Sequence, residues 1–151
     1  MQIREATLGD LGNVGAICDA SDRARWTSEM ITPLTERIVL VATIQDEVVG
    51  VAKTHFHGEP DGKAPAGHYL GGVVVPPNSR RRGIGSALTR ARMEWTWTRS
   101  STVYYFANEH NVASIRMHQA LGFQSVGQFT AIRGVRADDG RSELVLFQAC
   151  R

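Results

Sequence analysis

Hydrophobic and polar positions along the chain follow two periods, one typical of strands and one typical of helices. Runs rich in β-branched and aromatic residues predict strands at 2–6, 38–44, 48–56, 69–75, 102–107, 123–132 and 143–149. Apolar residues that recur every three or four positions predict helices at 7–20, 83–98 and 111–121, with a shorter one within 27–35. The order β-α-α-β-β-β-α-β-α-β-β is typical of a mixed α/β fold with one sheet and helices on its faces.

Three of the strands have a predicted partner or place in the sheet. The short polar link Gln45-Asp46-Glu47 predicts that 38–44 and 48–56 form a hairpin. Residues 69–75 are too apolar to have a solvated face, so we expect a central strand there, ended by Pro76-Pro77.

Capping residues also mark the start of one predicted helix and the end of another, and the last two strands are expected at the edge of the sheet. Thr7 and Asp10 form a cap-like pattern at the start of helix 7–20. Gly122 is the expected C-cap of helix 111–121. The last two strands, 123–132 and 143–149, are expected to close the sheet as an antiparallel pair.

Length and composition limit the class of protein. The chain has 151 residues, of which 42% are hydrophobic and 21% charged, as in one soluble globular domain spanning 1–151. Its densest apolar run, 38–44, is far shorter than the roughly 20 residues that cross a bilayer. The first five residues lack the apolar run of a secretory signal, so we expect a cytoplasmic protein.

The charge and the cysteines exclude several functions. A formal net charge of +2 is too small for a nucleic-acid binder unless the charge is clustered. One such cluster exists, Arg80-Arg81-Arg82, and it leaves nucleic-acid binding open as a competing interpretation. Two cysteines, Cys18 and Cys150, make neither a disulfide framework nor a metal site.

A basic, glycine-containing turn follows the predicted central strand. Residues 80–86, here called the basic turn, read Arg-Arg-Arg-Gly-Ile-Gly-Ser and open the helix at 83–98. The first N–H groups of a helix lack internal partners and carry partial positive charge, so such an end binds phosphate. Glycine lets an anion approach the backbone, and arginine adds charge-assisted hydrogen bonds. The pattern predicts a diphosphate-binding turn; a solvated arginine-rich loop is the structural alternative.

Other phosphate-binding motifs fit this turn less well. A Walker A loop needs Lys-Ser/Thr after its last glycine, and a dinucleotide fingerprint has three glycines in the first βα unit. The basic turn has neither feature.

A second segment, 111–123, carries Asn111 and His118 seven residues apart. Seven steps of about 100° return to nearly the same helix face, so the two lie on one line about two turns apart. Asn near a helix start is often only a cap, and a lone His on a helix is usually a packed or surface residue. Their joint position on the helix after strand 102–107 favours a functional role.

Together the two segments resemble the GCN5-related N-acetyltransferase (GNAT) family. Arg80-x-x-Gly83-x-Gly85 matches the family's Q/R-x-x-G-x-G/A loop, and 111–123 matches its second motif, N-x-x-(A/S)-x-x-x-(Y/H)-x-x-x-G-F. The residues most similar to phosphinothricin-type and some aminoglycoside-type acetyltransferases are Ser114, Ile115, Arg116 and His118. The resemblance implies a mainly antiparallel central sheet with helices on both faces and splayed strands that hold acetyl-CoA.

By this resemblance acetyl-CoA is the co-substrate and no metal takes part. Its pantetheine arm would pair with the end of strand 69–75 like an added strand, and Asn111 would bond that arm or its amide. The diphosphate would bind mainly to N–H groups of the basic turn. The cofactor-binding residues that the resemblance implies are Val73, Val74, Val75, Arg80, Arg81, Arg82, Gly83, Ile84, Gly85, Ser86 and Asn111.

The resemblance also implies direct attack of an amine on the thioester, with His118 near the sulfur as general acid. An imidazole can donate a hydrogen bond in either protonation state. The chain departs from the family at the general base, because the two positions at which relatives carry Glu hold Phe106 and Leu70 here. We expect a water relay or the substrate's own deprotonated fraction, and the candidate bases left are His68, Glu109 and His110.

In this architecture the acceptor enters opposite the cofactor, past the first helix–helix turn and the closing strands. The candidate acceptor-binding residues are Asp22, Trp26, Glu29, His68 and Glu109. The leading hypothesis is acetylation of a primary amine of a small molecule, with an antibiotic such as an aminoglycoside among the candidates.

Two alternatives stay open: a protein or peptide N-acetyltransferase, and a non-catalytic acyl-CoA-binding module. We expect neither a nucleic acid nor a membrane as a partner. A monomer and a homodimer are both compatible with the sequence.

Overall fold

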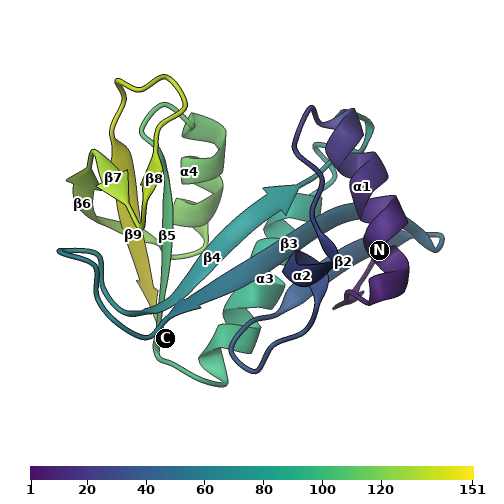
Figure 1. Ribbon diagram of the computed structural model, residues 1–151, viewed down its shortest axis with the longest axis horizontal. Helices are drawn as coiled ribbons and strands as arrows, with labels where there is room; N and C mark the ends of the chain where they lie inside the picture. The colour runs from purple at the N-terminus through teal and green to yellow at the C-terminus, as the bar shows by residue number, and fades with distance from the viewer. The chain divides into compact units, whose positions relative to one another are not determined.

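The hydrophobic runs form strands in the computed structural model, which describes residues 1–151 (Figure 1). The strands are β1 (Gln2–Glu5), β2 (Val39–Ile44), β3 (Glu47–His57), β4 (Gly67–Val74), β5 (Thr102–Asn108), β6 (Gln124–Phe129), β7 (Ala131–Ile132), β8 (Val135–Arg136) and β9 (Leu144–Cys150). The α-helices are α1 (Leu11–Ala20), α2 (Ser28–Ile31), α3 (Ile84–Trp97) and α4 (Val112–Ala120), and the 3₁₀ helices are η1 (Leu8–Asp10) and η2 (Pro77–Ser79). None of these helices has the length and apolar character that a membrane crossing requires.

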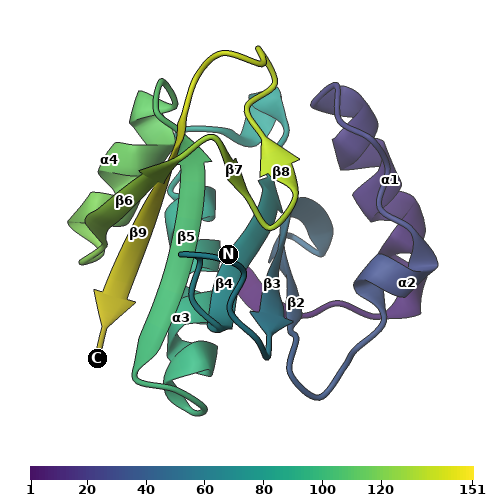
Figure 2. The same cartoon turned by 60° about the vertical axis from the view of Figure 1, so that its left-hand side comes forward.

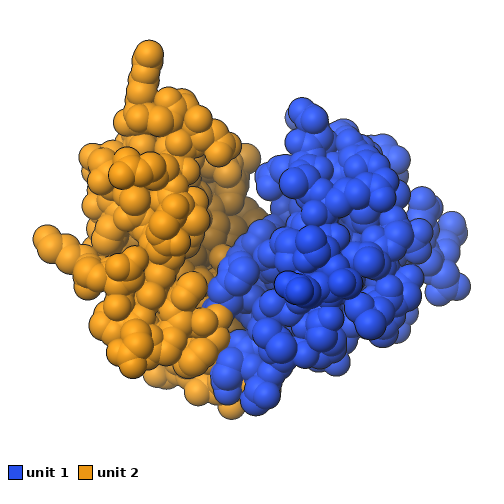
Figure 3. Space-filling model, viewed as in Figure 1, with its two compact units in different colours: residues 1–55, 71–95 blue, residues 56–70, 96–151 orange.

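Seven strands hydrogen-bond in the order β1-β2-β3-β4-β5-β9-β6, while β7 pairs with β8. The β1–β2, β2–β3, β5–β9 and β6–β9 pairs are antiparallel, and β4 and β5 are parallel, with Tyr69 opposite Tyr104. The mixed α/β fold and the mainly antiparallel sheet expected from the sequence are therefore confirmed. The chain divides into two units, 1–55 with 71–95 and 56–70 with 96–151 (Figure 3). One domain over 1–151 stays a prediction.

In the first unit, helices cover both faces of the β2–β3 hairpin (Figures 1 and 2). Successive strand side chains point to opposite faces, so each strand contributes alternate residues to two cores. The core under α1 and α2 includes Val14, Ile17, Ile31, Val39, Val41 and Val51. The core under α3 includes Leu40, Ala42, Ala52, Ile84 and Leu88.

The hairpin that builds this unit forms as expected. Gln45 and Asp46 have φ of 52° and 64°, which is the left-handed backbone of a tight turn whose twist matches the flanking strands. Val41 then pairs with Val51, so both side chains enter the core under α1 and α2.

Strand β4 departs from one expectation. It begins two residues earlier than predicted, at Gly67, and ends before Pro76-Pro77 as expected. The prediction that this strand lacks a solvated face is wrong at Gly72, which is exposed, and Gly71 and Val73 are partly exposed. Because glycine adds no side chain, this stretch has few apolar atoms of its own to cover.

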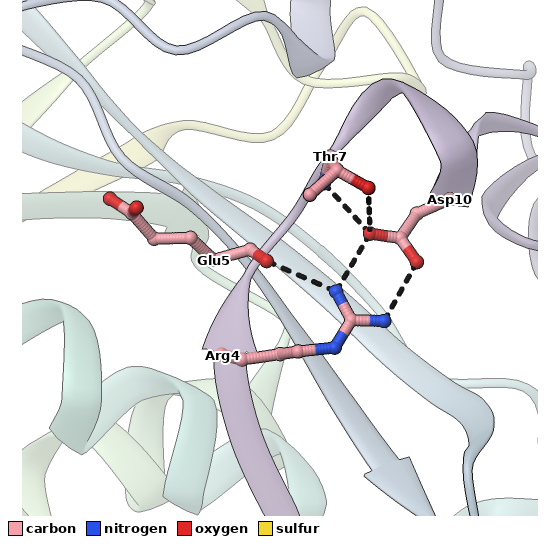
Figure 4. Close-up of polar contacts among 4 residues, drawn as sticks. All are labelled: Arg4, Glu5, Thr7 and Asp10. Carbon is pink, nitrogen blue, oxygen red and sulfur yellow. Dashed lines mark hydrogen bonds and ion pairs between the residues drawn. The ribbon is translucent and has the colours of Figure 1, made fainter.

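The start of the first helix is held by an ion pair rather than by a plain cap (Figure 4). Arg4 donates two hydrogen bonds of 2.8 Å to the two carboxylate oxygens of Asp10. The N–H of Thr7 donates to Asp10 Oδ2 at 2.7 Å, so the predicted Thr7–Asp10 pattern is present. The predicted helix 7–20 starts with η1 and becomes α-helical only at Leu11.

Replacing Asp10 by asparagine is expected to cost about 1–2 kcal/mol of stability at pH 7, because Arg4 holds the pKa of Asp10 down to about 2. The folded-state pKa lies below the unfolded value of about 3.9, so this stabilisation is present at neutral pH. It is lost as the pH falls from about 4 through 2. Urea unfolding of wild type and Asp10→Asn at pH 7 and pH 3 measures it, with the exposed Asp138→Asn as control. Equal losses in both variants would contradict the assignment.

In the second unit, β5, β9 and β6 are neighbours, and alternate residues of β5 again serve two faces. On one face, Tyr105 contacts the rings of His118 and Phe123, which lie on or just after α4. The other face is a core that includes Tyr69, Ile132, Ala137, Leu144 and Leu146, with Tyr104 and Phe106 packed against it. The C-cap of α4 is Leu121, and Gly122, predicted as the C-cap, follows it with φ of 101°, so the helix ends one position earlier than predicted.

The predicted strand 123–132 is only partly correct. Residues 124–129 pair with β9 as expected. Ala131 and Ile132 instead pair with Arg136 and Val135 across a turn at Arg133-Gly134, both with positive φ. The single closing strand of the prediction is therefore β6 followed by a separate short hairpin.

Candidate active site

The basic turn joins β4 to α3 within the first unit. After η2, the chain passes through Arg81 with φ of 63° and Gly83 with φ of 76°, both in the left-handed region. Glycine adopts this conformation without strain, and Arg81 adopts it at some cost. A Cβ atom built on Gly83 or on Gly85 would meet no atom within 4 Å, so the space over this turn is open.

The first backbone N–H groups of α3 point out of the helix without a helical acceptor. The first i to i−4 bond runs from the N–H of Ala87 to the carbonyl of Gly83 at 2.9 Å. The N–H groups of Ile84, Gly85 and Ser86 precede it and have no intrahelical partner. Together with the helix dipole, they offer three donors to an anion.

The arginines of the basic turn divide into two kinds. Arg80 donates its Nε–H to the carbonyl of Val75 at 2.9 Å, so it fixes the turn to the strand end. Arg81 and Arg82 are exposed. Their guanidinium groups are the ones that the turn presents to solvent, and hence to a ligand.

The residues expected to contact the pantetheine arm are mostly core. The side chain of Val74 is buried in the core under α1 and α2, and Val73 and Val75 pack against the core under α3. Val73 and Val75 stay partly exposed, and the carbonyl of Val75 already accepts from Arg80.

A buried arginine that the sequence reasoning missed lies behind the basic turn. Arg92 of α3 is 0% exposed and donates Nη1 to the carbonyls of Lys53 and Gly71 at 3.0 and 3.1 Å. Its Nη2 donates to Thr89, whose hydroxyl donates to the carbonyl of Gly85. A polar path thus connects two strands to the glycine of the turn. The signal was present, because Arg92 stands four residues after Leu88 on the apolar face of the helix.

Asn111 and His118 lie on α4 in the second unit. Asn111 precedes the helix and is exposed, and its side chain makes no capping hydrogen bond. The interpretation of Asn111 as a simple cap is therefore not supported by the geometry.

His118 is 3% exposed and its ring lies flat on Tyr105, with the two centroids 3.4 Å apart and the planes at 3°. Its Nδ1 lies 2.8 Å from the carbonyl oxygen of Ser114. A carbonyl only accepts, so Nδ1 carries the proton and Nε2 is an acceptor in the neutral ring. Donation from Nε2 then requires the imidazolium. This corrects the expectation that either protonation state donates.

The candidate bases have differing surroundings. His68 is buried, with its ring 4.8 Å from that of Phe56. Glu109 accepts a hydrogen bond from the backbone N–H of Glu143 at 3.2 Å and lies 3.6 Å from Nε2 of His110. Phe106 packs against the core of the second unit, so the position at which some relatives carry a carboxylate is apolar here.

The candidate acceptor-binding residues of the first unit differ in how exposed they are. Asp22 follows α1 with φ of 54°, and both it and Glu29 are exposed. Trp26, a candidate acceptor-binding residue, is 8% exposed and belongs to the core under α1 and α2, so little of its ring is open to a ligand. One face of its ring carries the ammonium group of Lys53, 4.5 Å from the ring centroid. No cluster of His, Cys, Asp and Glu is arranged to hold a metal.

The fold is a mixed α/β sheet with a glycine-containing helix start at α3. Residues 11–123 match the model of the acetyltransferase (GNAT) family. The chain therefore belongs to that family.

Named relatives and solved structures resemble this chain to different extents. A mycothiol acetyltransferase from Renibacterium salmoninarum is 30% identical over 83 residues, which are 52% of this chain and 23% of that protein. An aminoglycoside N(6')-acetyltransferase type 1 from Klebsiella aerogenes is 36% identical over 66 residues, 43% of each chain. The chain thus spans less than half the length of these curated relatives. A ribosomal-protein-alanine N-acetyltransferase from Brucella melitensis superposes with a TM-score of 0.74 and 26% identity, over 100% of both chains.

Proposed function

We propose that this protein is an acetyl-CoA-dependent N-acetyltransferase that acts on the primary amine of a small molecule. Membership of the family supports the reaction class, because its acetyltransferases use acetyl-CoA as co-substrate. The observation that carries the proposal is the start of α3, where three N–H groups lack helical acceptors and two glycines have open space over them. A diphosphate, the group present in coenzyme A, suits such a helix start.

In this proposal each part of the first motif has a distinct task. The N–H groups of Ile84, Gly85 and Ser86 bind the diphosphate, and Arg81 and Arg82 add charge-assisted hydrogen bonds. Arg80 holds the turn against Val75. Backbone groups of residues 73–75 bind the pantetheine arm, and Asn111 is proposed to bond the same arm.

The bound co-substrate supplies an activated acetyl thioester, which the neutral amine attacks directly. We assign His118 as the general acid for the departing thiolate: protonated, it donates from Nε2 while Ser114 holds Nδ1. The amine must first lose a proton. With Phe106 and Leu70 unable to accept it, a water relay or the amine's own neutral fraction serves, and His68 and Glu109 are the side chains to test. A kcat/KM that is flat around neutral pH would remove every protein base.

Two relatives that resemble this chain act on different classes of amine. The aminoglycoside enzyme supports a small-molecule amine, and the ribosomal-protein enzyme supports a peptide amine as the second candidate. A non-catalytic acyl-CoA-binding module differs from both because it would bind coenzyme A without turnover. The cytoplasmic location and the oligomeric state stay predictions.

Coenzyme A at about 100 times its Kd is expected to stabilise the protein by about 2.7 kcal/mol. For a domain of this size, this raises Tm by several degrees. A thermal melt with and without coenzyme A measures the shift, and dephospho-coenzyme A and pantetheine report which part of the molecule binds. An unmoved melting curve would contradict both the enzyme and the binding module.

Turnover separates the remaining alternatives. Thiol release from acetyl-CoA is followed against aminoglycosides, phosphinothricin, amino acids, polyamines and peptides. Acetylation of a small amine supports the proposal, and acetylation of peptides alone supports the second candidate. A melting shift without any turnover supports the binding module.

A further inference from the structure

Lys53 is a buried cation with an unusual set of neighbours in the first unit. It lies on β3 opposite Val39, facing α1 and α2, and is 8% exposed. Its Nζ lies over the ring of Trp26, 4.5 Å from the centroid, and this cation–π contact favours the charged form. No oxygen accepts a hydrogen bond from this ammonium group, although a buried charge is costly unless it is paired.

The charges around Lys53 do not neutralise it. Burial lowers the pKa of Lys53, and the nearby Arg37 lowers it further. The one carboxylate of α1, Asp19, is paired with Arg25. Lys53 is therefore buried beside a second cation, Arg37, and no carboxylate of the chain pairs with it.

Arg37 adds a second unsatisfied donor. Its Nη2 donates to the carbonyls of Glu29 and Thr32, which fixes the guanidinium at the end of α2. Its Nε is buried and has no hydrogen-bond acceptor. A buried donor without a partner is destabilising, and a ligand oxygen that accepted from it would remove that cost.

Gly72 borders the Lys53 side of this pair of cations. Gly72 is exposed, and a Cβ built on it would lie 3.4 Å from Cζ2 of Trp26 and 3.9 Å from Cε of Lys53. The missing side chain therefore leaves room for about one methyl group in ordinary contact with the indole ring and the lysine stem. Gly72 also immediately precedes Val73, the first residue proposed to bind the pantetheine arm.

We infer that Lys53 and Arg37 bind an anionic group of the acceptor, entering beside Gly72, so that the acceptor is an amine that also carries a carboxylate or a similar oxyanion. This inference rests on the proposed function and specifies its substrate class. Two unneutralised cations attract an α-amino acid or a related compound and repel a polycation such as an aminoglycoside. The indole of Trp26 forms one wall.

The experiment compares acceptors that differ in a single charge. Thiol release from acetyl-CoA is measured with the L-α-amino acids and phosphinothricin, and with the amino acid amides, which lack the carboxylate. Wild type is expected to favour the acids over their amides. Lys53→Met keeps the apolar stem over Trp26 and removes the charge. It should raise KM for the acids by about 10- to 100-fold, with little change for the amides or for acetyl-CoA.

Two further variants keep the test decisive. Lys63→Met removes the exposed second lysine of the chain and should leave all KM values unchanged. Gly72→Ala, which retains every charge, should raise KM for the acids by filling that space beside the indole ring, and it serves if Lys53→Met does not fold.

Each possible result either supports or contradicts the inference that Lys53 and Arg37 bind an anionic group. Equal use of acids and amides, a preference for aminoglycosides, or a uniform loss in Lys53→Met would overturn the inference while leaving the acetyltransferase assignment intact. Without turnover, acceptor binding to the coenzyme A-saturated protein is measured by calorimetry. Binding of the acids but not of their amides would support the anion site alone, and failure to bind either would reject it. A coenzyme A melting shift reports separately on the proposed function.

Discussion

Replacing His118 by phenylalanine is expected to lower kcat by roughly 10²–10⁴-fold while coenzyme A binding stays intact. Phenylalanine preserves an aromatic ring on Tyr105, whose centroid lies 3.4 Å from that of His118, so the packing of the second unit survives. The substitution removes the donor at Nε2. In the wild type, the hydrogen bond from Nδ1 to the carbonyl of Ser114 orients that donor. Turnover by thiol release gives kcat, and the coenzyme A melting shift gives the binding.

The matched control is Tyr105→Phe. It removes the hydroxyl that hydrogen-bonds Ser114 Oγ but keeps the stack under His118. Its kcat is expected to stay close to that of wild type, which shows that disturbing this layer does not by itself slow the reaction. A wild-type kcat in His118→Phe would remove His118 as the acid. An equal loss in both variants would assign His118 a structural role.

The parts of the fold predicted well from the sequence depend on residues close together in the chain. The polar link at Gln45-Asp46 predicted a hairpin because two positive-φ residues complete such a turn, and Gly122 predicted a helix end for a similar reason. The basic turn belongs to this group too, since a strand, two glycines and a helix start follow each other directly. Local chemistry decides these features, so a single sequence carries them.

The features that were missed or misjudged depend on residues far apart in the chain. Trp26 was proposed to stack on the acceptor, but it lies in a core cluster with residues distant in the chain, among them Val39 and Val51. Arg92 was passed over because a charged residue on an apolar face is normally solvated. Here the carbonyls of Lys53 and Gly71, 39 and 21 positions away along the chain, satisfy its charge.

The protonation of His118 shows the same limit at the candidate site itself. The motif places a histidine at this position, but a sequence does not say which ring nitrogen carries the proton. The carbonyl of Ser114, one helical turn earlier, assigns it to Nδ1. The site's residue types were thus predictable, whereas their hydrogen-bonding state follows only from the folded backbone.

Replacing Gly85 by glutamate is expected to weaken coenzyme A binding by roughly 10²–10⁴-fold without loss of stability, because like charges placed together cost several kcal/mol. The new side chain has room, since a Cβ at Gly85 meets no atom within 4 Å. In the free protein a carboxylate in the first turn of α3 interacts favourably with the helix dipole, and glutamate has a higher helix propensity than glycine. Tm is therefore expected to hold or rise while affinity, measured by calorimetry, falls.

The comparison with Gly85→Gln separates charge from size. Glutamine has nearly the same shape, so it excludes the ligand from the backbone to a similar extent but does not repel it. We expect its loss of affinity to be clearly smaller than that of glutamate, and the difference to shrink at high salt, which screens exposed charges. If both variants bound coenzyme A as wild type does, the diphosphate would not lie at the start of α3. Because Gly85→Glu stabilises the helix on its own, lost binding in a protein that melts no earlier than wild type cannot be attributed to unfolding.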